Sequence, residues 1–398
     1  MEHKTRIKGN VHYVGVNDRN KHRFEGMWPL PYGVSYNSYL IDDEMVALVD
    51  TVDICYFEVY LRKIKQVIGE RPINYLIINN MEPDHSGSIR LIKQHYPGII
   101  IVGNKQTFGM IEGFYGVTGE QYLVKEGDFL ALGHHKLRFY MTPMVHWPET
   151  MMTFDETDGV LFSGDGFGCF GTVDGGFLDT RINVDKYWGE MVRYYSNIVG
   201  KYGSPVQKAL QKLGGLPISA ICSTHGPVWT ENIAKVIGIY DRLSRYDADE
   251  GVVIAYGSMY GNTEQMAEAI AEELSVQGVK KIVMHNVTKS HPAYIIADIF
   301  RYKGLIIGSP TYSNQIFPEV EALLSKILLR EVKGRYLGYF GSFTWAGAAV
   351  KRLAEFAEKS KFELVGDPVE MKQAMKDLSY TQCENLARAM ADRLKKDR

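Results

Sequence analysis

The chain has 398 residues, of which 45% are hydrophobic and 23% charged, and its 45 basic and 47 acidic side chains leave a formal net charge of −2. This composition is typical of a globular protein of two or three domains, and it excludes a disordered chain, a collagen-like repeat and a coiled coil. The small net charge gives no overall field for nucleic acid or an anionic membrane, and no run approaches the roughly 18 apolar residues of a transmembrane helix.

The cysteines and the N-terminus indicate a reducing compartment. Cys55, Cys169, Cys222 and Cys383 are far apart and form no C-x-x-C motif, so neither a disulfide framework nor a site of four thiolates is expected. The first residues lack the apolar core of a signal peptide. We therefore expect a cytoplasmic protein.

The first part of the chain, residues 1–250, is predicted to be a domain of strands and helices. The predicted strands are Val11–Val16, Ser35–Ile41, Met45–Asp50, Tyr75–Ile78, Ile99–Val102, Leu137–Met141 and Gly159–Phe162. The predicted helices span 56–69, 86–95, 185–199 and 231–245. Several strands in succession favour stacked sheets with helices outside them.

Acidic and histidine side chains follow several of these strands. The strand ending at Ile78 leads into a loop with Glu82, Asp84 and His85 within four residues. Such charges are costly to bury unless they are satisfied, and a metal ion is their natural partner. Further candidate ligands, each after a later apolar run with Gly or Pro close by, are His146, Asp165 and His225.

The donor set indicates which metals would suit such a site. Three carboxylates beside three imidazoles favour iron or manganese over zinc, and Asp165 is the natural bridge, with one oxygen for each of two metals. Taken singly, His146 or His225 is more often a hydrogen-bonded structural histidine, and Asp165 alone could be a turn residue.

The polar segment 244–251 is a predicted linker. In the second domain, residues 251–398, predicted strands and helices alternate regularly. The predicted strands are Val252–Tyr256, 281–286, Gly304–Ile307, Tyr336–Phe340 and one near 362–366. The predicted helices lie near 262–275, 293–301, 318–329, 346–358 and 375–394. Five strands alternating with five helices predict a doubly wound parallel sheet.

The first strand of this second domain leads into a candidate phosphate loop. A loop between a strand end and a helix N-terminus presents free backbone N–H groups and the positive end of the helix dipole. Ser258, Asn262 and Thr263 add donors, and Gly261 allows close approach of the backbone. The loop matches neither the nucleoside triphosphate nor the dinucleotide pattern. The alternative is that the Gly-Asn-Thr turn is only a helix cap.

Two more loops at strand ends are rich in polar donors and aromatic rings. Ligands in such sheets bind beyond the carboxyl ends of the strands, where Tyr312 and Trp345 could flank a flat ring. The candidate binding residues of the three loops are Ser258, Met259, Tyr260, Gly261, Asn262, Thr263, Ser309, Pro310, Thr311, Tyr312, Ser313, Asn314, Ser342, Phe343, Thr344, Trp345, Ala346 and Gly347.

These motifs resemble two known folds. The loop 258–263 resembles the phosphate loop of flavodoxin, and this resemblance over 251–398 implies FMN. The E-x-D-H cluster at 82–85, followed by His, Asp and His, resembles the metallo-β-lactamase fold, an αββα sandwich with two metals at its edge. A fusion of the two with Glu82 in the first cluster resembles the flavodiiron proteins over essentially the whole chain. Further matching stretches are Gly33–Leu40, His146–Met151 and Ser223–Gly226.

The flavodiiron resemblance implies an activity. The family reduces dioxygen to water or nitric oxide to nitrous oxide at two irons, which we expect Asp165 and an oxo or hydroxo group to bridge. Reduced FMN and the iron pair each supply two electrons, which together make the four that dioxygen needs. The resemblance also implies a head-to-tail homodimer or a dimer of dimers, in which each flavin faces the partner's irons.

The resemblance further suggests an electron donor and contact residues. This chain has no rubredoxin-like Cys pair, so we expect an external donor such as rubredoxin or an NADH-linked reductase. Trp147 and Trp345 are candidates for the contact between copies, with core packing as the alternative. Phe24, Glu25 and Trp28 come from a loop that could cap the site.

One position departs from the family pattern H-x-E-x-D-H, because Asn80 stands where the first His is usual. Asn is a poor, neutral ligand for iron, so one iron would keep an open or water-filled position. The main alternative function is a zinc hydrolase of the same fold that cleaves an ester or thioester. This alternative gives the flavin domain no role. A flavin carrier with a decayed metal site is a second alternative, and Asn80 is the only feature in its favour.

Overall fold

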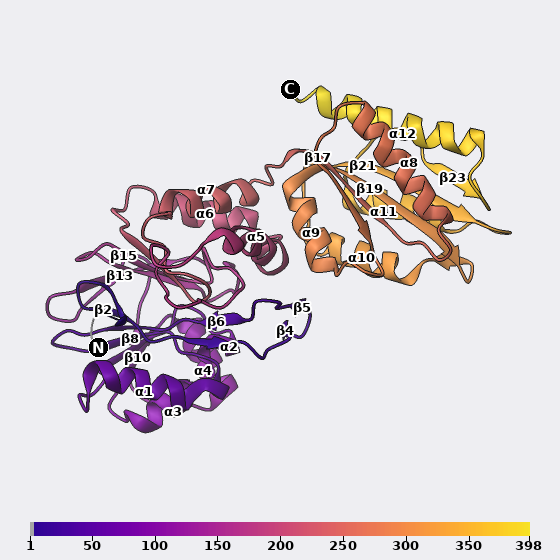
Figure 1. The fold of residues 1–398 in the computed structure, drawn as a ribbon. Coiled ribbons are helices and arrows are strands. Elements are labelled where there is room, and N and C mark those ends of the chain that lie inside the picture. The colour runs from indigo at the N-terminus through magenta and orange to yellow at the C-terminus, as the bar shows by residue number, and fades with distance from the viewer. Residues whose placement is uncertain (1–3) are drawn as a thin grey trace. The chain divides into compact units, whose positions relative to one another are not determined.

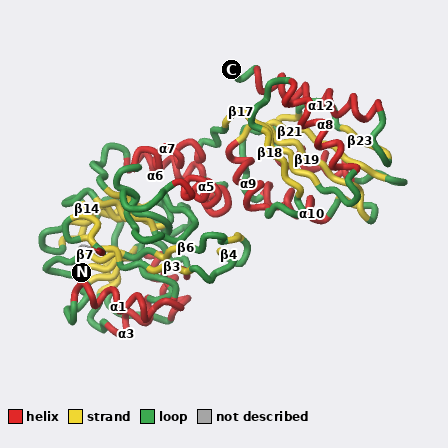
Figure 2. The backbone as a smooth tube through the Cα atoms, viewed as in Figure 1, coloured by secondary structure: helices red, strands yellow, loops and turns green. Residues whose placement is uncertain are grey.

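The computed structural model describes residues 4–398, which divide into two compact units between Ser244 and Arg245 (Figure 1). Long loops separate the strands of the first unit, whereas helices and strands alternate more regularly in the second (Figure 2). Within residues 4–398, no helix has both the length and the apolar character needed to cross a lipid bilayer.

The N-terminal unit is built on two sheets, with strand orders β1–β2–β7–β8–β9–β10–β11 and β12–β13–β14–β15–β16. The first consists of β1 (Arg6–Lys8), β2 (Val11–Tyr13), β7 (Tyr39–Ile41), β8 (Ala47–Val49), β9 (Tyr75–Ile77), β10 (Ile100–Gly103) and β11 (Gln121–Leu123). The second consists of β12 (Phe129–Ala131), β13 (Lys136–Met141), β14 (Met151–Asp155), β15 (Val160–Gly164) and β16 (Ala220–Ser223). Two short pairs are β3 (Val16–Asp18) with β6 (Val34–Tyr36), and β4 (Arg23–Phe24) with β5 (Trp28–Pro29).

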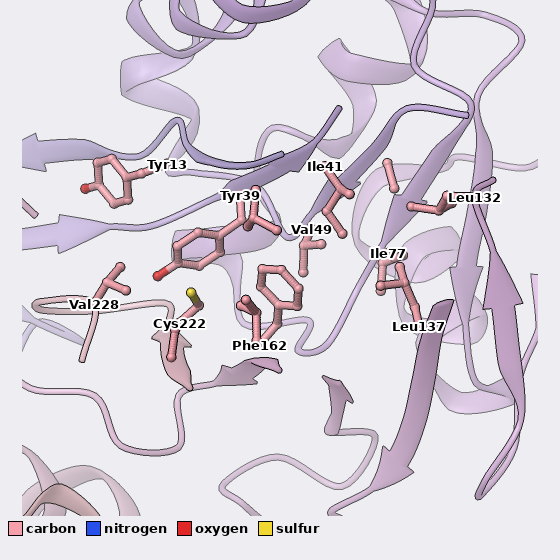
Figure 3. Packing of buried hydrophobic residues seen from close by; sticks show 14 of the residues in the cluster. Tyr13, Tyr39, Ile41, Val49, Ile77, Leu132, Leu137, Phe162, Cys222 and Val228 are labelled. Carbon is pink, nitrogen blue, oxygen red and sulfur yellow. The ribbon is translucent and has the colours of Figure 1, made fainter. Parts of the chain in front are cut away.

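The core of this unit is a cluster of side chains drawn from both sheets (Figure 3). Tyr39, Val49 and Ile77 come from the first sheet, and Leu137 and Phe162 come from the second. Alternate residues of a strand face the same side, so each strand contributes every second residue to this layer. Burying a side chain of this size contributes about 1.5–3 kcal/mol, which makes the layer between the sheets a main source of stability.

Helices cover the outer faces of the two sheets, which completes an αββα sandwich (Figure 1). These helices are α1 (Phe57–Ile68), α3 (Ile89–His95), α4 (Lys105–Tyr115), α5 (Asp185–Tyr194), α6 (Gly203–Leu213) and α7 (Ile233–Ser244). In α1, the buried residues Phe57, Tyr60, Leu61, Ile64 and Ile68 recur every three or four positions. This spacing forms one apolar stripe along the helix, which suits packing on a sheet.

The C-terminal unit has one central sheet in the order β18–β17–β19–β21, followed by two short strands that pair with β21. Its strands are β17 (Asp249–Tyr256), β18 (Ile282–Asn286), β19 (Tyr302–Tyr312), β20 (Gln315–Ile316), β21 (Tyr336–Phe343), β22 (Glu363–Leu364) and β23 (Val369–Lys372). All the pairs are parallel except that of β19 with β20. The chain order is therefore 2-1-3-4-5, which is the flavodoxin-like doubly wound order.

Five helices flank this sheet: α8 (Asn262–Val276), α9 (Pro292–Arg301), α10 (Pro318–Leu328), α11 (Ala349–Ser360) and α12 (Asp377–Lys395). Helices α8 and α12 lie side by side (Figure 1). Ile270 of α8 and Leu386 of α12 share a buried cluster with Ile254 and Ile306 of the sheet. The fold predicted from the sequence, an αββα sandwich followed by a five-stranded doubly wound sheet, is confirmed.

Several elements differ from the sequence-based expectation. The strand expected near 362–366 is split into β22 and β23, because Gly366 turns the chain with φ +70°. The helix expected over 185–199 is α5 followed by a π-helical turn, Tyr195–Val199. The sequence did not predict strands β1, β4, β5, β11, β12, β14, β16 and β20 or helices α4 and α6. The chain divides at Ser244, a few residues before the boundary expected at 250.

Candidate metal centre and flavin-binding loops

The loop after β9 places three of the six predicted metal ligands at the start of the short helix α2 (Pro83–Ser86). Pro83 occupies the first helical position, where its fixed φ and missing N–H suit a helix start. Glu82 stands just before the helix, and Asp84 and His85 lie within its single turn. Glu82 and His85 are buried and Asp84 is nearly so. The start of this short helix therefore places three candidate metal ligands close together.

The structure brings all six predicted ligands together, with Asp165 at the centre. Asp165 follows β15, and its Oδ1 lies 3.2 Å from His85 Nε2 and 3.4 Å from His225 Nε2. Its Oδ2 lies 3.1 Å from Nε2 of His146, which comes from the loop between β13 and β14. The two oxygens of one carboxylate thus face different histidines.

The carboxylates of Glu82 and Asp84 lie beside different histidines, so the six candidate ligands form two groups around Asp165. Glu82 Oε2 lies 3.0 Å from His146 Nε2. Asp84 Oδ2 lies 3.2 Å from His225 Nε2, and Asp84 Oδ1 lies 3.5 Å from His85 Nε2. Glu82 and His146 form the group that faces Asp165 Oδ2, called here the Glu82 position. The group that faces Asp165 Oδ1, called here the Asp84 position, consists of Asp84, His85 and His225.

Several of these donor atoms have no ordinary hydrogen-bond partner. Both oxygens of Asp84, both ring nitrogens of His85 and Nε2 of His225 are buried without one. Each such atom costs about 1–3 kcal/mol when it is left unpaired. Cations among these atoms would remove that penalty, and a mixture of carboxylate and imidazole donors suits iron or manganese. The residues present therefore fit a pair of metal ions.

The electrostatics of the cluster support the same interpretation. Burial alone would lower the pKa of His85, but Asp84 and Asp165 outweigh it and raise that pKa to about 10. Burial and the nearby charge of Asp84 raise the pKa of Glu82 to about 7. Burial opposes ionisation of Asp165, yet the histidines hold its pKa well below the usual range. Without metal, protons on the histidines supply the positive charge that the carboxylates require.

The backbone fixes the orientation of His225. Its Nδ1 lies 2.8 Å from the Ser35 carbonyl oxygen, which can only accept, so Nδ1 carries the proton and Nε2 points at the carboxylates. Asn37 holds the same loop by donating from Nδ2 to the carbonyl oxygens of Ser223 (2.9 Å) and Gly226 (2.8 Å). Both contacts come from the stretch 33–40, whose supporting role sequence reasoning did not identify.

Asn80 is buried within the cluster. Its Nδ2 donates to Asp165 Oδ2 at 2.8 Å, and its Oδ1 accepts from the backbone N–H of Glu82 at 3.2 Å. Glu149, also buried, accepts from the Met81 backbone N–H at 2.7 Å through Oε1. The loop that carries the candidate ligands is therefore held at both Met81 and Glu82.

A cavity of about 620 Å³ opens beside the candidate ligands and is lined in part by Glu82 and Asp84. Phe24 and Glu25, from the β4–β5 hairpin, line its other side. The ring centre of Phe24 lies 5.4 Å from that of His225. Trp28 does not line the cavity but is buried, with Nε1 donating to Glu25 Oε2 at 2.9 Å. This hairpin thus forms part of the cavity wall beside the candidate ligands.

The three predicted flavin loops meet around a smaller cavity of about 230 Å³ in the C-terminal unit. Predicted residues that line it are Ser258, Met259, Tyr260, Asn262, Thr263, Pro310, Thr311, Ser342, Phe343 and Thr344. The hydroxyl oxygens of Thr263 and Ser342 are 2.8 Å apart and connect the first loop to the third. Gly261 precedes α8 with φ +92°, a conformation that favours glycine.

The other predicted contacts do not line this cavity; they are Gly261, Ser309, Tyr312, Ser313, Asn314, Trp345, Ala346 and Gly347. The Ser309 hydroxyl accepts from the Phe317 backbone N–H at 3.2 Å, which is a structural role. Tyr312 and Trp345 are 49% and 81% exposed, so both rings are open to contact. Gln373 and Ala374 line the cavity without having been predicted. They follow β23, the strand whose position the sequence reading missed.

Comparison with known proteins agrees with both units. Residues 34–226 match the ODP family beta lactamase, and residues 254–385 match flavodoxin. The chain is 32% identical over 363 residues to an anaerobic nitric oxide reductase flavorubredoxin of Vibrio vulnificus, covering 90% of this chain and 73% of that protein.

Solved structures are similar over nearly the full length. Rubredoxin oxygen:oxidoreductase from Desulfovibrio gigas superposes with a TM-score of 0.93 at 31% identity, covering 97% of each chain. The flavodiiron protein from Giardia intestinalis has a TM-score of 0.92 at 27% identity, covering 98% of this chain and 97% of that one. The fold and site define a metallo-β-lactamase-like domain joined to a flavodoxin domain. The chain belongs to the flavodiiron protein family, as the sequence predicted.

Proposed function

We propose that this protein is an oxidoreductase that reduces dioxygen to water, nitric oxide to nitrous oxide, or both, with two irons in the N-terminal unit and FMN in the C-terminal unit. The observation that carries the proposal is Asp165, whose two carboxylate oxygens face two separate sets of donors. One relative is named a nitric oxide reductase and another an oxygen oxidoreductase, so both substrates belong to the proposal.

The proposed metal ligands follow the two groups of side chains. Glu82 and His146 would hold one iron with Asp165 Oδ2, and Asp84, His85 and His225 would hold the other with Asp165 Oδ1. Asp165 is the proposed protein bridge, beside an oxo or hydroxo group. When bound, the two irons supply the redox chemistry at which a diatomic substrate reacts. Three carboxylates offset most of the positive charge of two ferrous ions.

The surrounding residues keep these ligands in place and shape the access to them. The Ser35 carbonyl keeps Nε2 of His225 directed at the carboxylates. The Thr224 hydroxyl donates to Asp165 Oδ1 and turns this carboxylate toward both groups. Phe24 and Leu91 place apolar surface on the wall of the neighbouring cavity, which suits a small uncharged substrate.

The proposed FMN site uses the three loops of the C-terminal unit. The backbone N–H groups at the start of α8, with Ser258, Asn262 and Thr263, would bind the phosphate. Tyr312 and Trp345 are proposed to flank the flavin ring, because both side chains are exposed near the loop ends. Bound FMN supplies electrons to the metal centre.

The proposal includes the partners and assembly that the sequence suggested. Electrons would come from rubredoxin or an NADH-linked reductase, and a relative named rubredoxin oxygen:oxidoreductase supports the first. A head-to-tail homodimer or dimer of dimers would bring the flavin of one copy to the irons of another. The proposed location is the cytoplasm, and the proposed domains are residues 1–250 and 251–398.

The test starts with elemental analysis and an optical spectrum of the purified protein. We expect about two irons and one flavin per chain. The protein is then reduced without oxygen and given separate pulses of dioxygen and nitric oxide, with both rates measured. Rapid reoxidation by at least one gas supports the proposal. Zinc without flavin would contradict it and favour a hydrolase, and a metal site that stays empty after iron reconstitution would favour a flavin carrier.

A further inference from the structure

We propose that Asn80 positions the bridging carboxylate without binding metal, and that the Glu82 position is therefore the weaker and more open of the two metal positions. This inference rests on the proposed function, because it concerns how two irons share Asp165. It assigns a role to the residue at which the chain departs from the family pattern.

The hydrogen bonds of Asn80 determine how its amide is turned. A carboxylate oxygen cannot donate, so the group 2.8 Å from Asp165 Oδ2 must be the NH2. A backbone N–H cannot accept, so the group 3.2 Å from the Glu82 nitrogen must be the amide oxygen. The one ligand-type atom of Asn80 is thus engaged by the backbone, and its NH2 side, which cannot bind a cation, faces the cluster.

Asn80 and Thr224 act on opposite oxygens of the same carboxylate. Asn80 donates to Oδ2 of Asp165, and the Thr224 hydroxyl donates to Oδ1. Each carboxylate oxygen has two lone pairs, so one hydrogen bond leaves the other lone pair for a metal. The two donors therefore hold the Asp165 carboxylate in a bridging orientation, and each of its oxygens keeps a lone pair that can bind a metal.

The two positions then differ in their protein donors. The Glu82 position has Glu82, His146 and one oxygen of Asp165. The Asp84 position has an additional imidazole, because both His85 and His225 face it. The histidines also differ in exposure, since His146 keeps 8% of its surface exposed while His85 and His225 keep none. The Glu82 position therefore has fewer protein donors and a more exposed histidine, and both differences lower its affinity for a metal.

A metal-retention experiment tests this difference without measuring activity. The iron-loaded, flavin-containing protein is dialysed without oxygen against increasing concentrations of a ferrous chelator, and iron per chain is measured by elemental analysis. We expect a plateau near one iron per chain. Asn80→His adds an imidazole at the Glu82 position, and the first iron should then need about tenfold more chelator or higher to leave.

Two further variants separate positioning from general damage. Asn80→Ala removes the hydrogen bond to Asp165, and the first iron should leave at about 10–100-fold less chelator, the range seen when a residue supporting a metal ligand is lost. Asn197→Ala is the matched control, because Asn197 is also buried but its amide nitrogen donates to Arg193 and Ser196. Asn197→Ala should release iron as the wild type does.

The outcomes distinguish this inference from the proposed function. Loss of both irons in a single step from the wild type would overturn the inference, as would wild-type release from both Asn80 variants. Either result leaves a di-iron oxidoreductase in place. A wild-type protein that binds no iron would instead contradict the proposed function itself. Circular dichroism of each variant verifies that it is folded.

Discussion

Replacing Asp165 by asparagine is expected to abolish the bridge and to destabilise the metal-free chain. Asparagine keeps the shape of the side chain but loses its negative charge, and one acceptor oxygen becomes an NH2. In the wild type, Thr224 donates to one oxygen of Asp165 and Asn80 donates to the other. Whichever way the new amide turns, its NH2 faces one of these donors, so at least one donated hydrogen bond is lost.

The magnitude follows from the surroundings of this carboxylate. Asp165 is fully buried, and three imidazole nitrogens lie 3.1–3.4 Å from its oxygens. Removing one partner from a buried ionic network costs about 3–5 kcal/mol. Melting temperatures of domains of 150–250 residues change by about 2–4 °C per kcal/mol. We therefore expect the N-terminal unit of metal-free Asp165→Asn to melt roughly 6–20 °C below the wild type.

The assay compares thermal unfolding of chelator-treated proteins at pH 7 and iron content after reconstitution. The matched control is Asp174→Asn, because Asp174 is 50% exposed and its ion pairs with Arg19 and Lys186 lie at the surface. Exposed pairs contribute about 0–1 kcal/mol, so the control should melt within a few degrees of the wild type. An Asp165→Asn protein that keeps two irons and an unchanged melting temperature would refute the reasoning.

Three other changes have expected outcomes. Thr263→Val removes the hydroxyl that contacts Ser342, and FMN affinity measured by fluorescence titration should fall about tenfold, the equivalent of one hydrogen bond. Phe162→Ala leaves a hole between the sheets and should lower the free energy of unfolding in urea by about 3–5 kcal/mol. For His135, burial alone lowers the pKa, but the hydrogen bond to Asp155 outweighs it and raises the pKa above the ordinary 6.5. The stability from this pair is thus complete below pH 6.5 and is lost as pH rises through the folded-state pKa, so the destabilisation by His135→Gln, measured by urea unfolding, should shrink from pH 6 to alkaline pH.

The convergence of the candidate metal ligands could be predicted because they follow apolar runs. Asp165 comes directly after β15, and His225 lies two residues beyond β16. The strand that became β15 was predicted from its apolar run, whereas β16 was not; the two pair in parallel, so their carboxyl ends lie side by side. The role of Asn80 was not predictable in this way. Its partner Asp165 is 85 positions away in sequence, and only the folded geometry shows which end of the amide faces it.

The flavin site shows a different limit. The loop 258–263 was recognisable from local sequence, because Gly261 and several polar donors lie between a predicted strand and a predicted helix; in the structure Gly261 has φ +92°. Gln373 and Ala374 were missed because the fifth strand is interrupted at Gly366 and resumes as β23. Apolar patterning does not reveal such a split when each piece has only two to four residues.

The contacts of Asn79 explain how ligands from two sheets keep one geometry. Asn79 follows β9 of the first sheet, its carbonyl accepts from the Met151 N–H of β14 at 3.0 Å, and its side-chain oxygen accepts from Thr153 at 2.8 Å. In the second sheet, Gly164 pairs with Ser223, so the next residues, Asp165 and Thr224, emerge side by side. The strand pairing thus brings residue 165 to the cluster, and the hydrogen bonds from Asn80 and Thr224 then set the orientation of its carboxylate. A neutral amide at residue 80 can therefore alter how the Glu82 position holds its metal while the framework of strands stays the same.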